Sequence, residues 1–128
     1  MEVIDRWLDL VGTGSMDDLE AMMADDVVFY SPAVFTPQKG RPLAMAYLLA
    51  AEKLFFDADT GFGYVEKWIG DTSAVLHFTA EVDGLEVEGI DMIHWNAEGK
   101  ITEFKVMVRP FKALQGVIGR MAELLAAP

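Results

Sequence analysis

The sequence predicts an α+β fold, in which a cone-like, curved antiparallel sheet carries three helices packed on its concave face plus a C-terminal helix. Three observations lead to this prediction. Apolar residues recur at helical spacing up to residue 56, alternate with polar residues between residues 61 and 108, and return to helical spacing after Pro110. Helices that precede a run of antiparallel strands are typical of α+β proteins, because the helices cover one face of the sheet.

Length and composition favour one domain, which we predict over residues 1–128. The 128 residues are 52% hydrophobic and 24% charged, so the chain can bury a core and is too apolar to be disordered. The sequence contains no cysteine. This excludes a disulfide framework, a thiolate metal site and a cysteine nucleophile.

The acidic charge excludes polyanionic partners. The chain has 21 acidic and 10 basic side chains, a net charge of −11, whereas nucleic acids and anionic membranes attract clusters of Lys and Arg. The most apolar stretch, residues 43–56, contains Glu52 and Lys53, and is therefore not expected to span a bilayer. The N-terminal residues lack the basic region of a signal peptide. We therefore expect a cytoplasmic protein that binds neither nucleic acid nor membranes.

Two short helices are predicted first. Apolar residues at helical spacing predict a helix over 3–11, and Gly12-Thr13-Gly14 would end it. Ser15 is expected to cap a second helix, because its hydroxyl can accept a backbone N–H bond and Asp18 can reach back to the cap. The apolar stripe of this second helix would include Met23.

A strand, a loop and a longer helix follow. Residues 27–31 are rich in β-forming side chains, and residues 31–42 contain three prolines and Gly40, which predicts a loop. Pro42 suits the first turn of a third helix over 43–56, because proline loses no hydrogen bond there. That helix is nearly all apolar and should be buried on most sides.

Four strands and a final helix make up the rest of the chain. Alternation and turn residues predict these strands, with hairpin turns such as Asp83-Gly84 between them. The predicted strands cover residues 62–69, 73–82, 85–95 and 101–108, and the final helix covers residues 111–125.

Asp91 lies on the apolar face of its predicted strand. Side chains alternate between the two faces of a sheet, so Asp91 shares a face with Val87 and Ile93. A carboxylate in apolar surroundings is costly unless it is hydrogen-bonded or protonated, and burial favours the neutral acid. A neutral acid can donate a hydrogen bond to a ligand carbonyl and can move protons at neutral pH. The alternative is a structural role, in which Asp91 caps a backbone group or pairs with a buried cation.

Several segments resemble a known superfamily. Residues 23–29, residues 89–101 and residues 106–114 (MADDVVF, GIDMIHWNAEGKI and VMVRPFKAL) are similar to the nuclear transport factor 2-like superfamily, in its SnoaL-like and ketosteroid isomerase-like branches. The last segment resembles small bacterial members of unsettled function. The resemblance implies the cone fold over nearly the whole chain. It leaves the chemistry open, because the superfamily contains isomerases, cyclases, hydrolases, dehydratases and binding modules.

The resemblance also suggests residue roles. In ketosteroid isomerases a protonated Asp and a Tyr form the oxyanion hole, and a second Asp is the base. The oxyanion-hole Asp corresponds to Asp91, whereas the Tyr falls at Trp7 and the base at Ser31. Of the three roles, only that of the oxyanion-hole Asp therefore keeps its residue type. The Asp-Arg-Asp network of limonene epoxide hydrolases is not matched either, because residues 105–108 contain no acid.

The resemblance predicts a pocket around Asp91. Tyr47, on the buried third helix, needs a partner for its hydroxyl and could bond Asp91 or share a ligand oxygen with it. For the apolar members, ordinary core packing is the alternative interpretation. The predicted ligand-binding residues are Trp7, Phe29, Ser31, Tyr47, Leu76, Phe78, Ile93, Phe104 and Val106, and the lining would also include Ala80 and Val108.

These residues predict a protein that binds a small, mostly apolar molecule carrying a carbonyl or hydroxyl. As an enzyme it would catalyse an isomerisation, cyclisation or dehydration with Asp91 as the acid and with no cofactor or metal. The alternative is a non-catalytic ligand-binding or dimeric interaction module in which Asp91 is structural. The predicted lining contains no second group suited to acid–base work, which favours binding over catalysis.

The opposite face of the sheet is predicted to bind a second copy of the chain. His77 and His94 have the strand phase of this outer face, as do the apolar residues Ile90, Met92 and Met107. An apolar outer face indicates a partner surface, so we predict a homodimer. The competing prediction is that the C-terminal helix covers this face. We expect Arg109 to pair with Glu66 or Glu103 across strands.

Overall fold

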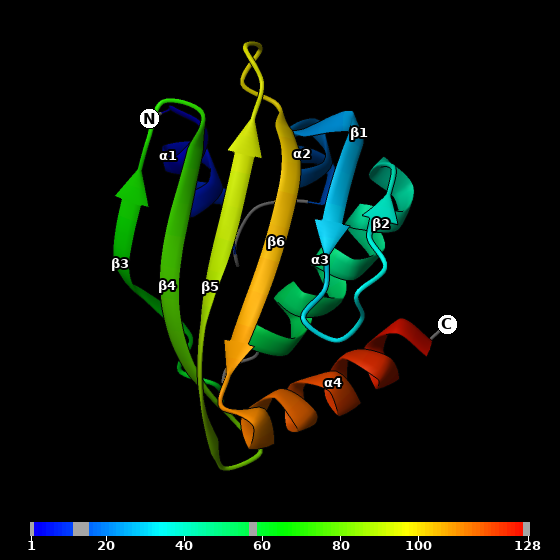
Figure 1. Cartoon of the computed structure of the whole chain (residues 1–128), viewed down its shortest axis with the longest axis vertical. Helices are drawn as coiled ribbons and strands as arrows, with labels where there is room; N and C mark the ends of the chain where they lie inside the picture. The colour runs from blue at the N-terminus through cyan, green and yellow to red at the C-terminus, as the bar shows by residue number, and fades with distance from the viewer. Residues whose placement is uncertain (1, 12–15, 57–58, 127–128) are drawn as a thin grey trace.

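The structure, a computed structural model, describes residues 2–11, 16–56 and 59–126. These residues form a curved six-stranded sheet and four helices (Figure 1). In chain order the elements are α1 (Glu2–Leu10), α2 (Met16–Ala21), β1 (Met23–Tyr30), β2 (Gln38–Lys39), α3 (Arg41–Phe55), β3 (Gly63–Ile69), β4 (Ser73–Val82), β5 (Leu85–Trp95), β6 (Ile101–Arg109) and α4 (Phe111–Ala126).

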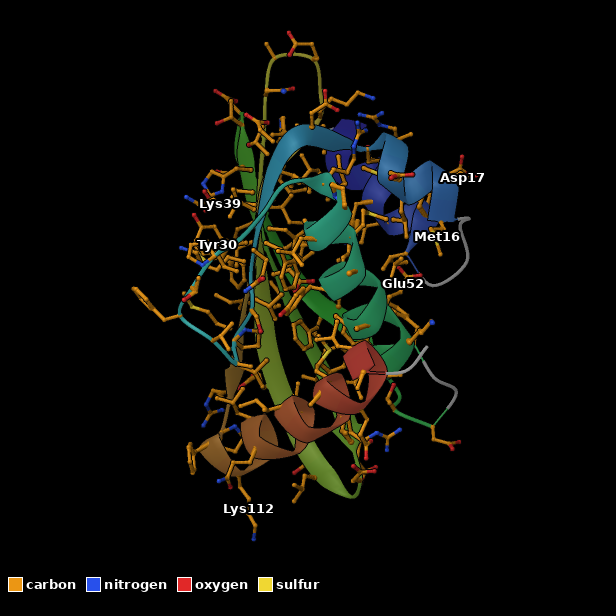
Figure 2. All side chains as sticks on the ribbon, turned by 90° about the vertical axis from the view of Figure 1, so that its right-hand side faces the viewer. Met16, Asp17, Tyr30, Lys39, Glu52 and Lys112 are labelled. Atoms are coloured by element: carbon orange, nitrogen blue, oxygen red, sulfur yellow. The ribbon has the colours of Figure 1, made fainter. Side chains whose placement is uncertain are left out.

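The strands follow the order β2-β1-β6-β5-β4-β3. All neighbouring strands are antiparallel except β1 and β6, which are parallel. Helices α1, α2 and α3 lie on the concave side of the sheet, and α4 crosses the end where β6 finishes (Figures 1 and 2). The predicted α+β cone is therefore confirmed.

Helix α4 leaves the outer sheet face uncovered. It buries Ala113, Val117 and Met121 and contacts α3 and the ends of β5 and β6. On the outer face, Trp68 remains 52% exposed and Met107 49% exposed. The competing prediction, that the C-terminal helix covers this face, is therefore wrong. The apolar side of α4 instead closes one end of the core.

The core lies between the concave face and the helices. Burial alternates along β4 and β5, as the period of two predicts, with residues such as Leu76, Phe78 and Ile93 almost fully buried. Ile4 and Trp7 of α1 are also buried in this core. Apolar burial on this scale, worth about 25 cal/mol per Å², is the main force that holds the helices on the sheet.

The first third of the chain differs from the sequence prediction. Met23 begins β1 rather than continuing the second helix, because the parallel pairing of β1 with β6 sets Met23 opposite Ile101. The Ile101 N–H also donates to the Met22 carbonyl over 2.8 Å. The short strand β2 forms within the predicted loop by pairing with β1. The predicted helix stop at Gly12-Thr13-Gly14 and the Ser15 cap lie outside the described residues.

Candidate functional site

Asp91 projects from the middle of β5 into the concave side of the sheet. Its cross-strand neighbours are Leu76 on β4 and Val106 on β6, both of which are buried. The residue itself is 6% exposed. The carboxyl therefore lies among apolar neighbours, as the strand phase predicts.

A chain of hydrogen bonds reaches Asp91 from two other elements. The Tyr64 hydroxyl, on β3, donates to Asp91 Oδ2 over 2.6 Å. The Trp7 indole Nε1–H, on α1, donates to the Tyr64 hydroxyl oxygen over 3.1 Å. Among the described residues, no hydrogen bond is found to the other oxygen of Asp91, Oδ1. One oxygen is therefore held by the protein, and the other is left for a ligand or water.

Burial dominates the protonation of this pair. Removal from water raises the pKa of Asp91 from 3.8 to about 7, although the hydrogen bond from Tyr64 opposes the rise. Burial, with the nearby Asp91 charge, also raises the pKa of Tyr64 well above its usual range. Asp91 therefore exists as both acid and carboxylate near neutral pH, which is the property that general acid–base chemistry requires.

The sequence did not predict Tyr64 as a site residue, because β3 contains an irregularity. Tyr64 pairs with the inward-facing Phe78, but Glu66 pairs with the outward-facing His77, so the register shifts at Val65. Regular alternation would place Tyr64 and Glu66 on the same face. A bulge redirects side chains in this way and is common beside functional sites. No periodic pattern in the sequence reveals it.

Gly89 allows the sheet to pack closely beside Asp91. A Cβ atom at Gly89 would lie 2.5 Å from the Met107 carbonyl oxygen and 2.5 Å from Cζ of Phe78. The Phe78 ring therefore occupies the space that a side chain at residue 89 would need. In this position the ring lies against Phe55 and Phe62, with ring centroids 5.3 Å and 5.0 Å away.

A small cavity lies beside Asp91, between the sheet, α1 and α3. Its volume is about 30 Å³, enough for only a few water molecules. Pockets for drug-sized ligands usually measure about 300–1,000 Å³. The lining residues are Trp7, Val11, Leu48, Ala51, Glu52, Phe55, Phe56, Phe62, Tyr64, Phe78, Asp91, Phe104 and Val106.

The structure brings some of the predicted site residues together and separates others. Trp7, Phe78, Asp91, Phe104 and Val106 line the cavity. By contrast, Phe29, Leu76, Ile93 and Ala80 lie in the core without being part of the cavity lining.

The remaining predicted residues face other surroundings. Ser31 and Val108 line a separate hollow beside the loop that follows β1, and the Ser31 hydroxyl accepts the Ala33 N–H. Tyr47 packs against Phe29, with ring centroids 5.9 Å apart, and the phenol that bonds Asp91 is that of Tyr64.

Helix α3 contributes a second carboxylate to the cavity. Leu48, Ala51, Glu52 and Phe55 follow the spacing of one helix face, and all four line the cavity. Glu52 is half-buried. With Asp91 and Tyr64, three titratable residues of the described part of the chain thus line the cavity. The expectation that the lining lacks a second acid–base group is therefore wrong.

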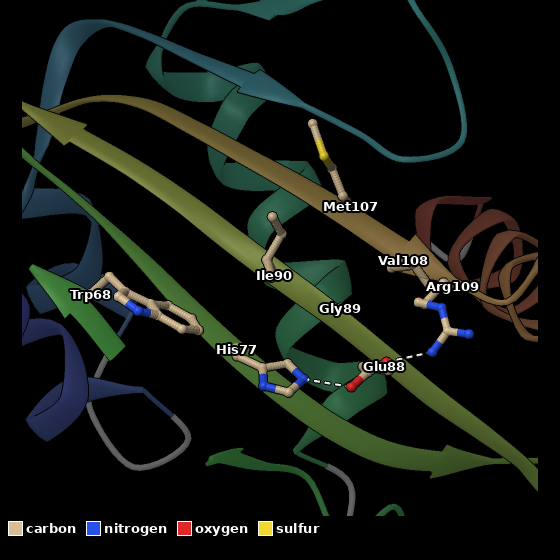
Figure 3. Close-up of a pocket in the computed structure, with 8 residues that line it drawn as sticks. All are labelled: Trp68, His77, Glu88, Gly89, Ile90, Met107, Val108 and Arg109. Atoms are coloured by element: carbon tan, nitrogen blue, oxygen red, sulfur yellow. Dashed lines mark hydrogen bonds and ion pairs between the residues drawn. The ribbon is translucent and has the colours of Figure 1, made fainter. Parts of the chain in front are cut away.

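A larger and more open groove lies on the outer face of the same strands (Figure 3). It measures about 410 Å³ and is lined mostly by apolar side chains, with Trp68 and Met107 among them. At one end, Glu88 accepts hydrogen bonds from Arg109 Nη1 over 2.6 Å and pairs with His77 Nε2 over 2.7 Å. Arg109, and then His77, lower the pKa of Glu88.

These contacts correct one predicted ion pair. Arg109 pairs with Glu88 rather than with Glu66 or Glu103, because β5 and β6 place residues 88 and 109 directly opposite each other. His77 and His94 have the predicted outward phase, and Nδ1 of His94 lies 3.7 Å from a carboxylate oxygen of Glu103.

Within residues 2–11, 16–56 and 59–126, no three metal-ligating side chains gather in one place. None of the helices in the described parts of the chain is long and apolar enough to cross a membrane.

The sequence pattern of the SnoaL-like domain family matches residues 4–104. The chain belongs to this family. The match runs from the first turn of α1 to the first four residues of β6 and therefore includes Trp7, Glu52, Tyr64 and Asp91. No curated protein sequence matches the chain.

Solved structures resemble this SnoaL-like chain over almost its full length. A steroid delta-isomerase from Pseudomonas aeruginosa is 31% identical, with a TM-score of 0.90 over 98% of this chain and 90% of the isomerase. An uncharacterised bacterial protein with a cystatin-like fold from Silicibacter pomeroyi is 27% identical, with a TM-score of 0.85 over 94% of this chain and 83% of that protein. The epoxide hydrolase/cyclase-like enzyme SalBIII, at 17% identity, has a TM-score of 0.66 over 84% of this chain and 88% of SalBIII, and shares the fold.

Proposed function

We propose that this protein binds a compact, mostly apolar ketone in the cavity beside Asp91 and catalyses a proton-transfer isomerisation of it. The observation that carries the proposal is the buried Tyr64–Asp91 pair, with its 2.6 Å hydrogen bond, at the cavity wall. Neutral Asp91 would donate a hydrogen bond to the ligand carbonyl and stabilise the enolate formed in the reaction. The 31% identity to a steroid delta-isomerase supports this class of reaction.

The size of the cavity limits the proposed substrate. A space of about 30 Å³ is far smaller than a four-ring steroid needs. Phe56 and Phe62 are half-buried and lie with ring centroids 4.6 Å apart at the cavity wall. A ligand with one ring would enter by displacing these two rings. We therefore place the substrate among small unsaturated ketones rather than steroids.

The proposed chemistry needs no added reagent. An isomerisation moves a double bond and a proton within one molecule, so it requires neither cofactor nor metal. Tyr64 positions Asp91 and stabilises its negative charge by donating a hydrogen bond to it. Trp7 orients Tyr64 by donating a hydrogen bond to its hydroxyl oxygen. The aromatic lining keeps water away from the enolate, which strengthens each hydrogen bond to it. The cytoplasmic location stays a prediction.

The test uses the β,γ-isomer of cyclohexenone, whose conversion to the conjugated ketone is followed by ultraviolet absorption. Asp91→Asn should keep its circular dichroism spectrum and lose turnover by about 10²–10⁴-fold, the usual contribution of an acid–base group. Glu86→Gln, at an exposed position of the same strand, should retain wild-type turnover. Equal turnover by wild type and Asp91→Asn would refute the role of Asp91.

The small cavity also favours a second candidate function, ligand binding without turnover. In that case the cavity would bind a small carbonyl or hydroxyl compound, and Asp91 would serve only as a hydrogen-bonding group. Calorimetric titration with conjugated cyclohexenone separates the two functions. Binding by wild type without turnover of the β,γ-isomer would support the binding module.

We also propose that two copies of the chain associate through the outer sheet face. The uncovered apolar residues Trp68 and Met107 support this interface. Met107→Glu should convert the dimer into a monomer in sedimentation velocity, because a charge would be buried at the interface. Leu125→Glu is the matched control, since Leu125 is 38% exposed on α4. A monomeric wild type would refute the interface.

A further inference from the structure

The cavity has a carboxylate on each of two facing walls. Asp91 belongs to the sheet, and Glu52 belongs to α3, which packs over the concave face. Figure 2 shows Glu52 on the helical side of the molecule, away from the outer sheet face. A molecule in the cavity would therefore lie between the two carboxyl groups. This arrangement is typical of sites that use one group as acid and the other as base.

The two walls are electrostatically linked through Tyr64. Burial and the Asp91 charge account for most of the rise in the pKa of Tyr64, and the Glu52 charge adds to it. Glu52 is therefore close enough for its charge to act on the hydroxyl that bonds Asp91. Among residues 2–11, 16–56 and 59–126, the titratable side chains that line the cavity are Glu52 on α3, Tyr64 on β3 and Asp91 on β5.

The surroundings of the two carboxyl groups suit different roles. Asp91 is 6% exposed and has a phenol as its partner, which favours the neutral acid. Glu52 is the less buried of the two carboxyl groups, although its Oε2 is shielded from water. Two carboxyl groups in different surroundings are a common way to divide the roles of acid and base.

We propose that Glu52 is the base of this cavity and works opposite Asp91 on a small β,γ-unsaturated ketone. This inference rests on the proposed function and assigns the proton acceptor that it lacks. Ser31, the position suggested by resemblance, lies in another hollow and has no basic group at neutral pH. The structure thus supplies from α3 the base that is absent at the end of β1.

The proposed reaction balances within the substrate. Glu52 takes a proton from the carbon between the carbonyl and the double bond, and the released C–H electron pair forms a new carbon–carbon double bond. The carbonyl π electrons move to oxygen, which accepts a hydrogen bond from Asp91. The electron pair of the original β,γ double bond then takes the proton from Glu52 at the γ carbon. The electron pair of the enolate double bond moves to join the α and β carbons, and an electron pair on oxygen re-forms the carbonyl. The product is the conjugated ketone, and both carboxyl groups regain their starting states.

The experiment compares Glu52→Gln, Glu52→Asp and the control Glu86→Gln on the β,γ-isomer of cyclohexenone. Glu52→Gln should lower kcat by about 10²–10⁴-fold with little change in KM, because it removes a base and keeps the shape of the side chain. Glu52→Asp should recover part of the rate. Glu86→Gln should match wild type. Wild-type kcat in Glu52→Gln, with turnover lost in Asp91→Asn, would overturn the inference and leave the proposed function intact.

A second readout does not require turnover. Para-nitrophenolate is a flat anion that resembles the enolate, and its binding is measured by its change in absorption. A negative Glu52 facing the cavity should repel it, so Glu52→Gln should bind it several-fold more tightly, whereas Glu86→Gln should not. Equal affinities would overturn the placement of Glu52. If wild type does not convert the ketone, the proposed function and the base role fail together, whatever the phenolate affinity.

Discussion

Asp91 and Glu88 lie three positions apart on β5, yet their pKa values shift in opposite directions. Asp91 faces the helices, and burial raises its pKa to about 7. Glu88 faces outward, where Arg109 and His77 lower its pKa. The difference shows that the face of the sheet on which a carboxyl group lies decides whether its pKa rises or falls. The inward group can exchange a proton at neutral pH, and the outward group remains a charged partner in an ion network.

The two concave regions beside these residues also differ. The outer groove is larger, at about 410 Å³ against about 30 Å³ for the inner cavity. The carboxyl group beside the groove already has two side-chain partners, Arg109 and His77, whereas Asp91 is held through one oxygen. The smaller cavity therefore has the groups suited to acid–base chemistry, and the larger groove has the character of a docking surface.

The largest expected effect concerns the packing of the inner face. Phe78→Ala should lower the free energy of unfolding by about 3–5 kcal/mol, because it leaves a hole among the aromatic rings beside Asp91. Thr79→Ala, at the next and exposed position of β4, should change it by less than about 0.5 kcal/mol. Urea denaturation measures both. Similar values would show that the two faces of β4 do not differ in packing.

The second effect is the pH dependence of stability. The folded state keeps the Asp91 proton up to about pH 7, whereas the unfolded state releases it near its ordinary pKa of 3.8. The contribution of Asp91 to stability should therefore fall as pH rises through this window, by about 1.4 kcal/mol per pH unit and on the order of 4 kcal/mol in total.

Asp91→Asn isolates this contribution, because an amide does not titrate. The difference in unfolding free energy between wild type and Asp91→Asn should shift in favour of the variant as pH rises from about 4 to about 7. Denaturation at several pH values tests this. A difference that stays constant with pH would mean that Asp91 ionises normally in the folded protein.

The third effect concerns the close packing around Gly89, where β5 lies against the Phe78 ring and the backbone of Met107. Gly89→Ala should lower the free energy of unfolding by about 1–3 kcal/mol, because its Cβ would overlap Phe78 and the Met107 carbonyl. Gly119→Ala should have the opposite sign, since Gly119 lies inside α4 with open space around it, and alanine favours a helix by about 0.5–1 kcal/mol. Thermal unfolding of the two variants gives the comparison.

The smallest effect is expected from the outer network. The stability that Glu88 contributes is fully present above its ordinary pKa of 4.5, and it is lost as the pH falls from there through the lowered pKa. Glu88→Gln should therefore reduce the loss of stability that occurs as the pH falls. Near neutral pH the midpoint of thermal unfolding should be almost unchanged, because exposed ion pairs contribute little to stability. Its turnover of cyclohexenone should equal that of wild type. A loss of turnover would connect the outer face to the site.

The sequence alone was sufficient for the fold and for Asp91. Alternation along residues 85–95 depends on backbone geometry, so the inward position of Asp91 could be read from residue order. The same period predicted the outward phase of His77 and Met107. Contacts between distant elements set the limits of this prediction. Met23 has helical spacing with Leu19, but its pairing with β6 places it in a strand.

The partners of Asp91 were decided by the tertiary structure. Tyr64 reaches Asp91 because a bulge at Val65 changes the phase of β3, and the register of two strands determines a bulge. Glu52 joins the cavity because α3 crosses the sheet with that helix face inward. The small size of the cavity follows from how the aromatic rings pack. The local sequence thus determined which residue is buried, and long-range packing determined what surrounds it.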